Sequence, residues 1–241
     1  MDFDNTYDDA LRAETYAKLE FHGTYYLAYR DLPRIIFDHV KGRNALDFGC
    51  GTGRSTRFLK KLGFKTIGID ISKEMLSIAM AKDPEGTYFL VVENDFSPLK
   101  EHCFDLVLSV FAFDNLPKMQ NKVNTFTKLG NSLKDTGVII NIVSSPEIYK
   151  HEWTSFSTKD FPENCRAKCG DKVKIIITDT NDKRPVEDII WPDEEYKKVY
   201  KQAGLEVINT YKPLATNEEP YKWVNETEIA PWVIYILKKS E

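Results

Sequence analysis

The chain has 241 residues, with 33 Lys and Arg against 37 Asp and Glu, so its formal net charge is −4, and 42% of its residues are hydrophobic. This composition is that of a globular protein and excludes the disordered and fibrous classes. The acidic balance disfavours nucleic acid as a partner, and the apolar runs are far shorter than the ~20 residues that span a bilayer.

Helical and strand patterns alternate over the first 143 residues. A tyrosine-rich N-terminal stretch predicts one or two helices, the last of them over residues 32–40, where a proline stands near the start. We then expect strands at 44–48, 65–70, 87–92, 104–111 and 137–143, with helices at 55–62, 73–81 and 118–133. Such alternation implies right-handed crossovers and a parallel sheet covered on both faces.

The alternation stops after residue 143. An irregular stretch leads to two strands, 172–178 and 186–191, which are separated by a polar turn and predict a small antiparallel excursion. The chain then returns to the main pattern with a helix at 193–203 and strands at 205–211 and 232–237.

The cysteines give no framework for a disulfide-rich fold. Cys165 and Cys169 lack a second pair of ligands nearby, so two free thiols are favoured over a zinc site, and we expect no metal ion. The N-terminus is acidic and lacks the basic-then-apolar pattern of a secretion signal. These features predict a cytoplasmic protein.

A glycine-rich loop follows the first strand and precedes a helix. Gly49, Gly51 and Gly53 allow sharp turns and close approach of a ligand to the helix N-terminus. Asp70 ends the next strand, where an acidic side chain can accept hydrogen bonds from ribose hydroxyls, although it could instead be a solvated helix cap. Arg54 stands where the dinucleotide fingerprint needs its third glycine, which argues against a nicotinamide-dependent oxidoreductase.

These motifs carry a family resemblance. The segment LDFGCGTG at residues 46–53 closely resembles the first motif of class I S-adenosylmethionine-dependent methyltransferases, and IGIDIS at 67–72 resembles their second, acidic motif. NDF at 94–96 is similar to the adenine-binding turn of the family, and 129–143 resembles its helix, turn and fifth strand. The resemblance is strong over residues 40–143.

The resemblance implies S-adenosylmethionine as cofactor, S-adenosylhomocysteine as product, and a role for each matching residue. The three loop glycines would cradle the methionine part with Asp47 bracing them, Asp70 would hold the ribose, and Asp95 would accept the adenine amino group. An N-terminal tyrosine or arginine would close over the cofactor. The full set implied is Tyr25, Arg30, Asp47, Gly49, Cys50, Gly51, Gly53, Asp70, Ile71, Met75, Asn94, Asp95, Phe96 and Val110, with no catalytic role for Cys50.

Pattern and resemblance together predict an α/β fold. We expect a doubly wound, Rossmann-like, mostly parallel seven-stranded sheet, its last strand antiparallel and helices on both faces, with an N-terminal helical cap and a small antiparallel β insertion. The chain would form one methyltransferase domain over residues 1–241. Its parts would be the cap (1–40), a cofactor-binding half (41–143), an acceptor-side insertion (144–191) and a C-terminal helix and strand pair (192–241).

Methyl transfer is an in-line displacement that needs proximity and alignment, and a general base only when the nucleophile is protonated. His151 and Asp114 are the two candidates for that base, each weighed against a surface or capping role. Several aromatic residues are candidates for an apolar acceptor pocket, although most could equally be core: Phe111, Phe113, Trp153, Phe156, Trp191 and Trp223.

The favoured function is methylation of an O or N atom of a small molecule by a monomer or homodimer. The Asn/Asp-Pro-Pro-aromatic motif of enzymes that methylate amino groups of bases or glutamine is absent. Methylation of tRNA or protein is the alternative among enzymes, and a cofactor-binding module without turnover is the alternative from another class.

Overall fold

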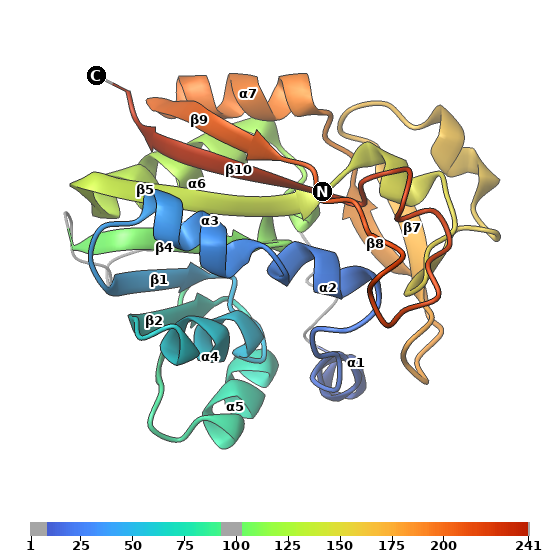
Figure 1. The fold of residues 1–241 in the computed structure, drawn as a ribbon, viewed down its shortest axis with the longest axis horizontal. Helices are drawn as coiled ribbons and strands as arrows, with labels where there is room; N and C mark the ends of the chain where they lie inside the picture. Colours follow the sequence, from blue (N-terminus) through green and yellow to red (C-terminus); the bar gives the residue numbers. More distant parts are fainter. Residues whose placement is uncertain (1–8, 93–102, 241) are drawn as a thin grey trace.

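The computed structural model describes residues 9–92 and 103–240, in which seven strands form one sheet in the order β3-β2-β1-β4-β5-β10-β9 (Figure 1). Neighbours from β3 to β5 pair in parallel, and β10 lies antiparallel between β5 and β9. This order confirms the predicted doubly wound sheet with an antiparallel last strand. The strands are β1 (Asn44–Phe48), β2 (Lys65–Asp70), β3 (Thr87–Leu90), β4 (Phe104–Val110), β5 (Leu133–Ser144), β9 (Leu205–Tyr211) and β10 (Trp232–Lys239).

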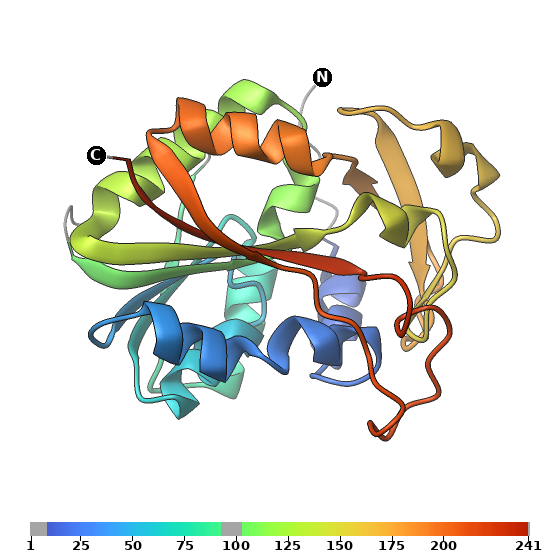
Figure 2. The ribbon, with the colours of Figure 1, turned by 45° about the horizontal axis from the view of Figure 1, so that its top comes forward.

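Helices cover both faces of this sheet (Figure 2). One face carries α3 (Leu32–His39) and α4 (Arg54–Lys61), and the other carries α6 (Met119–Ser132) and α7 (Asp193–Gln202). A fifth helix, α5 (Lys73–Lys82), packs on β2 and β3. The two faces enclose separate apolar clusters, as expected of a doubly wound sheet.

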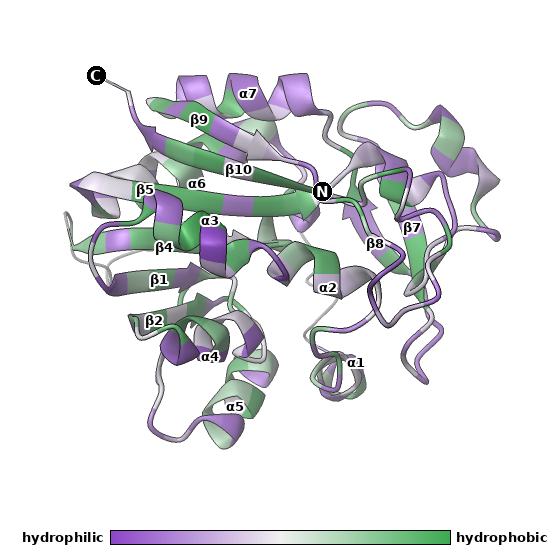
Figure 3. Ribbon diagram, viewed as in Figure 1, coloured by the Kyte–Doolittle hydropathy of each residue, from purple (hydrophilic) through white to green (hydrophobic). Residues whose placement is uncertain are grey.

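Side chains of each central strand alternate between these two clusters. In β4, Leu106 and Leu108 pack with α3 and α4, whereas Val107 between them packs with α6 and α7. Because both faces are buried, the central strands are nearly continuous apolar runs. Figure 3 shows β5 and β10 as hydrophobic over most of their length, while α7 presents hydrophilic residues on the side in view.

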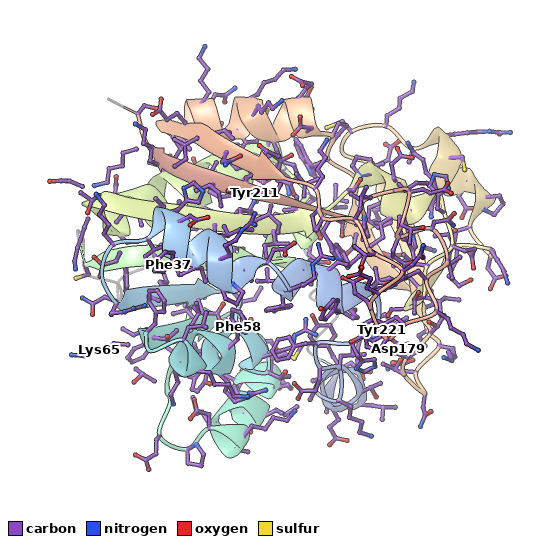
Figure 4. The ribbon with its side chains drawn as sticks, in the orientation of Figure 1. Phe37, Phe58, Lys65, Asp179, Tyr211 and Tyr221 are labelled. Carbon is purple, nitrogen blue, oxygen red and sulfur yellow. The ribbon has the colours of Figure 1, made fainter. Side chains whose placement is uncertain are left out.

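The N-terminal segment forms two helices, α1 (Ala10–Tyr16) and α2 (Thr24–Tyr29). α1 contacts α5, and α2 contacts α3 and β10. The Trp232 indole donates to the Thr24 carbonyl at 2.8 Å. Phe58 on α4, which is labelled in Figure 4, packs edge-on against Tyr29 with ring centroids 5.3 Å apart. These contacts hold the helical cap on the sheet.

A second, three-stranded sheet of β6 (Phe156–Ser157), β7 (Lys172–Ile177) and β8 (Val186–Ile189) lies beyond the carboxyl ends of β4 and β5 (Figure 1). Its strands pair antiparallel, which confirms the predicted insertion. β8 contacts the 3-10 helix η2 (Ala112–Asn115), which follows β4. Two further 3-10 helices, η3 (Pro146–Tyr149) and η4 (Pro162–Arg166), lie between β5 and β7, where the sequence predicts no regular element.

Most element bounds agree with the sequence prediction to within two residues, but β5 begins four residues early. Leu133 is fully buried and pairs with Phe104, so the strand includes the polar residues before Gly137. The helix before it therefore ends at Ser132. No helix within the described ranges is both long and apolar enough to cross a membrane.

Candidate functional site

A cleft with about 800 Å³ of open space lies at the carboxyl ends of β1, β2 and β4. β1 has β2 on one side and β4 on the other, so this is the point where the strand order reverses, the usual place for a ligand in an open α/β sheet. The residues around the cleft are Tyr16, Phe48, Gly49, Gly51, Ile69, Asp70, Ile71, Met75, Val91, Val110, Phe111, Ala112, Asn115 and Leu116.

Two of the three loop glycines face this cleft. Gly49, Gly51 and Gly53 all have positive φ angles (69°, 52° and 77°), a conformation that disfavours other residues. A Cβ at Gly51 would meet only the Met75 methyl group, at 3.9 Å, so a side chain there would occupy open cleft. A Cβ at Gly53 would instead approach the Tyr88 hydroxyl at 2.7 Å, away from the cleft.

Asp70 lies at the edge of the cleft and is fixed by backbone amides. One carboxylate oxygen accepts from the Gly51 amide at 2.7 Å, and the other accepts from the Ser72 amide at 2.9 Å. A carboxylate oxygen has two lone pairs, so each can accept a second hydrogen bond from a ligand hydroxyl. Asp70 therefore links the glycine loop to Ser72, the N-cap of α5, and its ribose role stays a prediction.

Asp47 supports the loop from behind without lining the cleft. It is fully buried, and its Oδ2 accepts from the hydroxyls of Ser55 and Thr56 at 2.7 and 2.6 Å. Burial raises the pKa of Asp47 to about 6, and the two hydroxyl hydrogen bonds oppose that shift. The bracing role expected for this residue agrees with these contacts.

The other expected cofactor residues divide into three groups. Ile71, Met75 and Val110 line the cleft, as the resemblance implies. Cys50 is buried in a small cluster with Leu76, Ala79 and Tyr88 and does not line the cleft. The adenine-turn residues Asn94, Asp95 and Phe96 lie outside the described residues.

The two N-terminal candidates lie elsewhere. Arg30 pairs with Asp31 and Glu219 and donates to the Leu214 carbonyl, so its guanidinium is engaged away from the cleft. Leu214 and Glu219 belong to the loop before β10, and the sequence did not reveal these partners. Tyr25 lines a second cavity instead of the cleft.

This second cavity, with about 450 Å³ of open space, adjoins the cleft and shares Tyr16, Phe111 and Asn115 with it. Phe111 has a φ of 63°, which is strained for a residue with a side chain and places its ring in the wall of both cavities. The three-stranded sheet closes the far side. The complete lining is Tyr16, Tyr25, Phe111, Asp114, Asn115, Ser144, Ile148, Tyr149, Phe156, Ile175, Ile177, Val186, Asp188 and Trp232.

Two buried carboxylates from distant parts of the chain lie in this cavity. The Asp114 carboxylate accepts from the Ser144 amide at 3.0 Å, and Asp188 accepts from the Tyr149 hydroxyl at 3.0 Å. Asn115, with its amide nitrogen toward Asp188, donates to it at 3.1 Å. Burial raises the pKa of Asp114 and the negative charge of Asp188 raises it further, while burial also raises the pKa of Asp188.

His151, the other candidate base, is not in either cavity. Its Nε2 lies 3.2 Å from a Glu147 oxygen and its ring packs edge-on against Trp153. A base role for this histidine stays a prediction, without support from either cavity. Of the aromatic candidates, Phe111 and Phe156 line the second cavity, whereas Phe113, Trp153 and Trp191 are buried core and Trp223 packs on Tyr221.

Sequence reasoning missed Asp188, Tyr149, Trp232 and Val91. Asp188 is an inward-facing acid in a short strand, and its partner at Asp114 is far away in sequence, so only the tertiary contact of β8 with η2 brings them together. No group of three or more metal-ligating side chains is found in the described part of the chain.

Comparison with known proteins identifies the family. Residues 46–141 match the methyltransferase domain family. An uncharacterized methyltransferase of Alkaliphilus oremlandii is 30% identical over 159 residues, covering 65% of this chain and 71% of the relative. The chain belongs to the class I S-adenosylmethionine-dependent methyltransferases. An uncharacterized methyltransferase of Bacillus licheniformis is also similar to this methyltransferase, with 31% identity over 165 residues, 66% of this chain and 71% of the relative.

Solved structures share its fold. An S-adenosylmethionine-dependent methyltransferase of Clostridium acetobutylicum superposes with a TM-score of 0.63 at 17% identity, covering 98% of this methyltransferase and 96% of the other chain. An S-adenosylmethionine-dependent methyltransferase from Mesorhizobium loti gives a TM-score of 0.62 at 16% identity. The match covers 86% of this methyltransferase and 96% of the other chain. The enzyme class and the cofactor follow from the family.

The cleft of this methyltransferase fits S-adenosylmethionine. Ile71, Met75 and Val91 provide apolar walls for a base, and Asp70 provides a carboxylate for hydroxyl groups at the same edge. Because Gly51 has no side chain, the part of the cleft that a Cβ at this position would occupy is open. An adenosyl group has this same combination of an apolar ring and a polar diol.

Proposed function

We propose that this enzyme methylates an O or N atom of a small molecule. The observation that carries the proposal is the second cavity, which opens beside the cofactor cleft and is closed on its far side by β6, β7 and β8. A cavity enclosed between the cap, η2 and the three-stranded sheet suits a small acceptor better than a nucleic acid or protein chain.

The cofactor cleft is proposed to use the residues that the family resemblance indicated. The backbone of Gly49 and Gly51 would hold the methionine part, Asp70 the ribose, and Ile71 with Met75 the adenine ring. Asn94, Asp95 and Phe96 are proposed to complete the adenine site, and Val110 to lie near the sulfonium. Asp47, Cys50 and Gly53 would support the loop from behind.

When bound, S-adenosylmethionine supplies a methyl group on a positively charged sulfur that leaves as a neutral thioether. The protein's contribution is to align the acceptor with this group and to exclude water, effects that together supply up to roughly 7–11 kcal/mol. Phe111 stands between the two cavities and, with Tyr16, would position the acceptor at their junction. Asp114, the buried carboxylate of the acceptor cavity, is proposed to take a proton from a protonated nucleophile.

The test has two stages. Titration calorimetry with S-adenosylmethionine and S-adenosylhomocysteine first measures cofactor binding. Methyl-labelled cofactor is then incubated with separate pools of small metabolites, tRNA and protein, and the label is followed into each pool. We expect incorporation into the small-molecule pool alone. Incorporation only into tRNA or protein would overturn the proposal, and cofactor binding without incorporation into any pool would identify a binding module.

The proposed organisation is one methyltransferase domain of four parts. Residues 1–40 form the cap, 41–143 hold the cofactor, 144–191 close the acceptor side and 192–241 complete the sheet. All four cysteines are free thiols, which supports the reducing cytoplasm as the place of action, either as a monomer or as a homodimer.

A further inference from the structure

The acceptor cavity holds two buried carboxyl groups. Asp114 and Asp188 are only 4% and 9% exposed, and both line the cavity. Of the described residues that line it, none is Lys, Arg or His. Burying an ionised carboxylate costs free energy unless a positive charge pairs with it. A cation is therefore the kind of ligand that this cavity would bind most favourably.

Two cations lie outside the cavity, Lys122 on α6 and Arg54 on α4. Lys122 is fully buried, donates to the Phe113 carbonyl, and its ammonium group lies 4.9 Å from the Trp191 ring and 5.3 Å from the Tyr196 ring. The Arg54 guanidinium lies 4.9 Å from the centre of the Tyr25 ring. Neither cation lines the cavity.

Aromatic rings also line this cavity. Tyr25, Phe111 and Trp232 pack together, with centroids 5.9 Å apart for Tyr25 and Phe111 and 4.4 Å apart for Phe111 and Trp232. Phe156 packs on Tyr25 at 5.1 Å. Ring faces attract cations, most strongly in a desolvated site, and they also accept the apolar part of an organic ammonium ion.

We propose that the methyl acceptor is an amine, bound as its ammonium ion between the Asp114 and Asp188 carboxylates and the rings of Tyr25, Phe111 and Trp232. This inference rests on the proposed function, because it names the substrate class of the same cavity. A hydroxyl acceptor would leave the buried negative charge unpaired, and a carboxylic acid would be repelled.

The reaction balances with these groups. The bound ammonium gives one proton to Asp114, and the freed nitrogen lone pair forms the new C–N bond to the methyl carbon. The C–S bond breaks and its electron pair stays on sulfur. The methylated nitrogen is again cationic and can give up a further proton to solvent on release.

Binding of an ammonium ion requires the carboxylates to be ionised. Asp114 faces Asp188 from β8, Lys122 from α6, Tyr149 from η3, and the buried phenols of Tyr196 and Tyr200 on α7. Since its pKa is raised in the free protein, an ammonium ion displaces a proton from it. Amine affinity is therefore expected to rise from pH 5.5 to pH 7.5.

The experiment compares benzylamine with benzyl alcohol on the unmodified full chain, without cofactor, with titration calorimetry as the readout. We expect benzylamine to bind at least about tenfold more tightly at pH 7.5, the effect of one hydrogen bond to a charged group. Equal or weaker binding of benzylamine overturns the inference.

Two variants locate the site. Asp114→Asn and Asp188→Asn each keep an oxygen that accepts the existing hydrogen bond but remove the charge, so each is expected to lose most of the amine preference. The exposed Asp160→Asn is the control and is expected to retain it. Retained preference in both cavity variants overturns the inference. The methyl-label assay is run on the unmodified chain in parallel, so a failure of the proposed function is seen separately as label in tRNA or protein alone, or in no pool.

Discussion

Asp70 holds the glycine loop and presents the only carboxylate among the described residues that line the cofactor cleft. Asp70→Ala is expected to weaken S-adenosylmethionine binding by ~1.5–3 kcal/mol, the size of hydrogen bonds to a charged group. Calorimetry measures the change. Asp83→Ala is the matched control, because Asp83 pairs with Lys60 away from the cleft, and its loss should leave cofactor affinity unchanged. An unaltered affinity in Asp70→Ala would refute the ribose assignment.

Gly51 and Gly63 share a left-handed conformation but differ in what surrounds them. Their φ angles are 52° and 86°, and a Cβ at Gly63 would meet no atom within 4 Å. Substitution by alanine is expected to lower the free energy of unfolding by about 1–2 kcal/mol at either position. Only Gly51→Ala is expected to weaken cofactor binding as well, because its methyl group enters the cleft. Urea denaturation and calorimetry separate the two effects, and equal cofactor affinities in both variants would contradict this account.

At the scale of single elements, α5 depends on its N-cap. The Ser72 hydroxyl accepts from the Met75 amide at 3.3 Å, and Met75 is the residue by which this helix reaches the cofactor cleft. Ser72→Ala is expected to cost about 1 kcal/mol of unfolding free energy. The exposed Ser77→Ala in the same helix is the control and should be neutral or slightly stabilising. Thermal unfolding of both variants checks the prediction, and equal melting temperatures would disprove the cap.

The three-stranded sheet shows how an element acquires function through its position. β8 is short and carries Asp188 on its inward face, where it meets η2 and hence Asp114. An insertion in the sequence thus completes the acceptor cavity instead of forming an independent unit.

At the scale of the whole molecule, buried carboxylates make stability depend on pH. Burial raises the pKa of Asp47 to about 6, against 3.8 for its ordinary value, and burial raises those of Asp114 and Asp188 as well. Between pH 4 and 6 the folded state therefore binds more protons than the unfolded state. Each such group lowers the free energy of unfolding by up to about 1.4 kcal/mol per pH unit as the pH rises through this window.

Urea denaturation at pH 4.5 and 6.5 measures this slope. Asp47→Asn is expected to flatten it, because the amide does not titrate. Lys122 has the opposite effect on the free energy of unfolding in the alkaline range. Because burial lowers its pKa, the unfolded chain binds the additional proton there, and stability rises with pH. An identical pH dependence in Asp47→Asn and the unmodified chain would show that this carboxyl does not contribute.

The amino-acid sequence by itself determined the sheet and the sequence of its helices and strands, because each period is read over a short window of the chain. The glycines at 49–53 and the acid at 70 follow two neighbouring strands, so the sequence also predicted the place of the cofactor. Only the tertiary structure revealed the second cavity. It brought Asp188 to Asp114, engaged Arg30 with Glu219, and left His151 outside both cavities. Contacts of this kind join residues far apart in the chain, and their formation depends on packing, which no local pattern encodes.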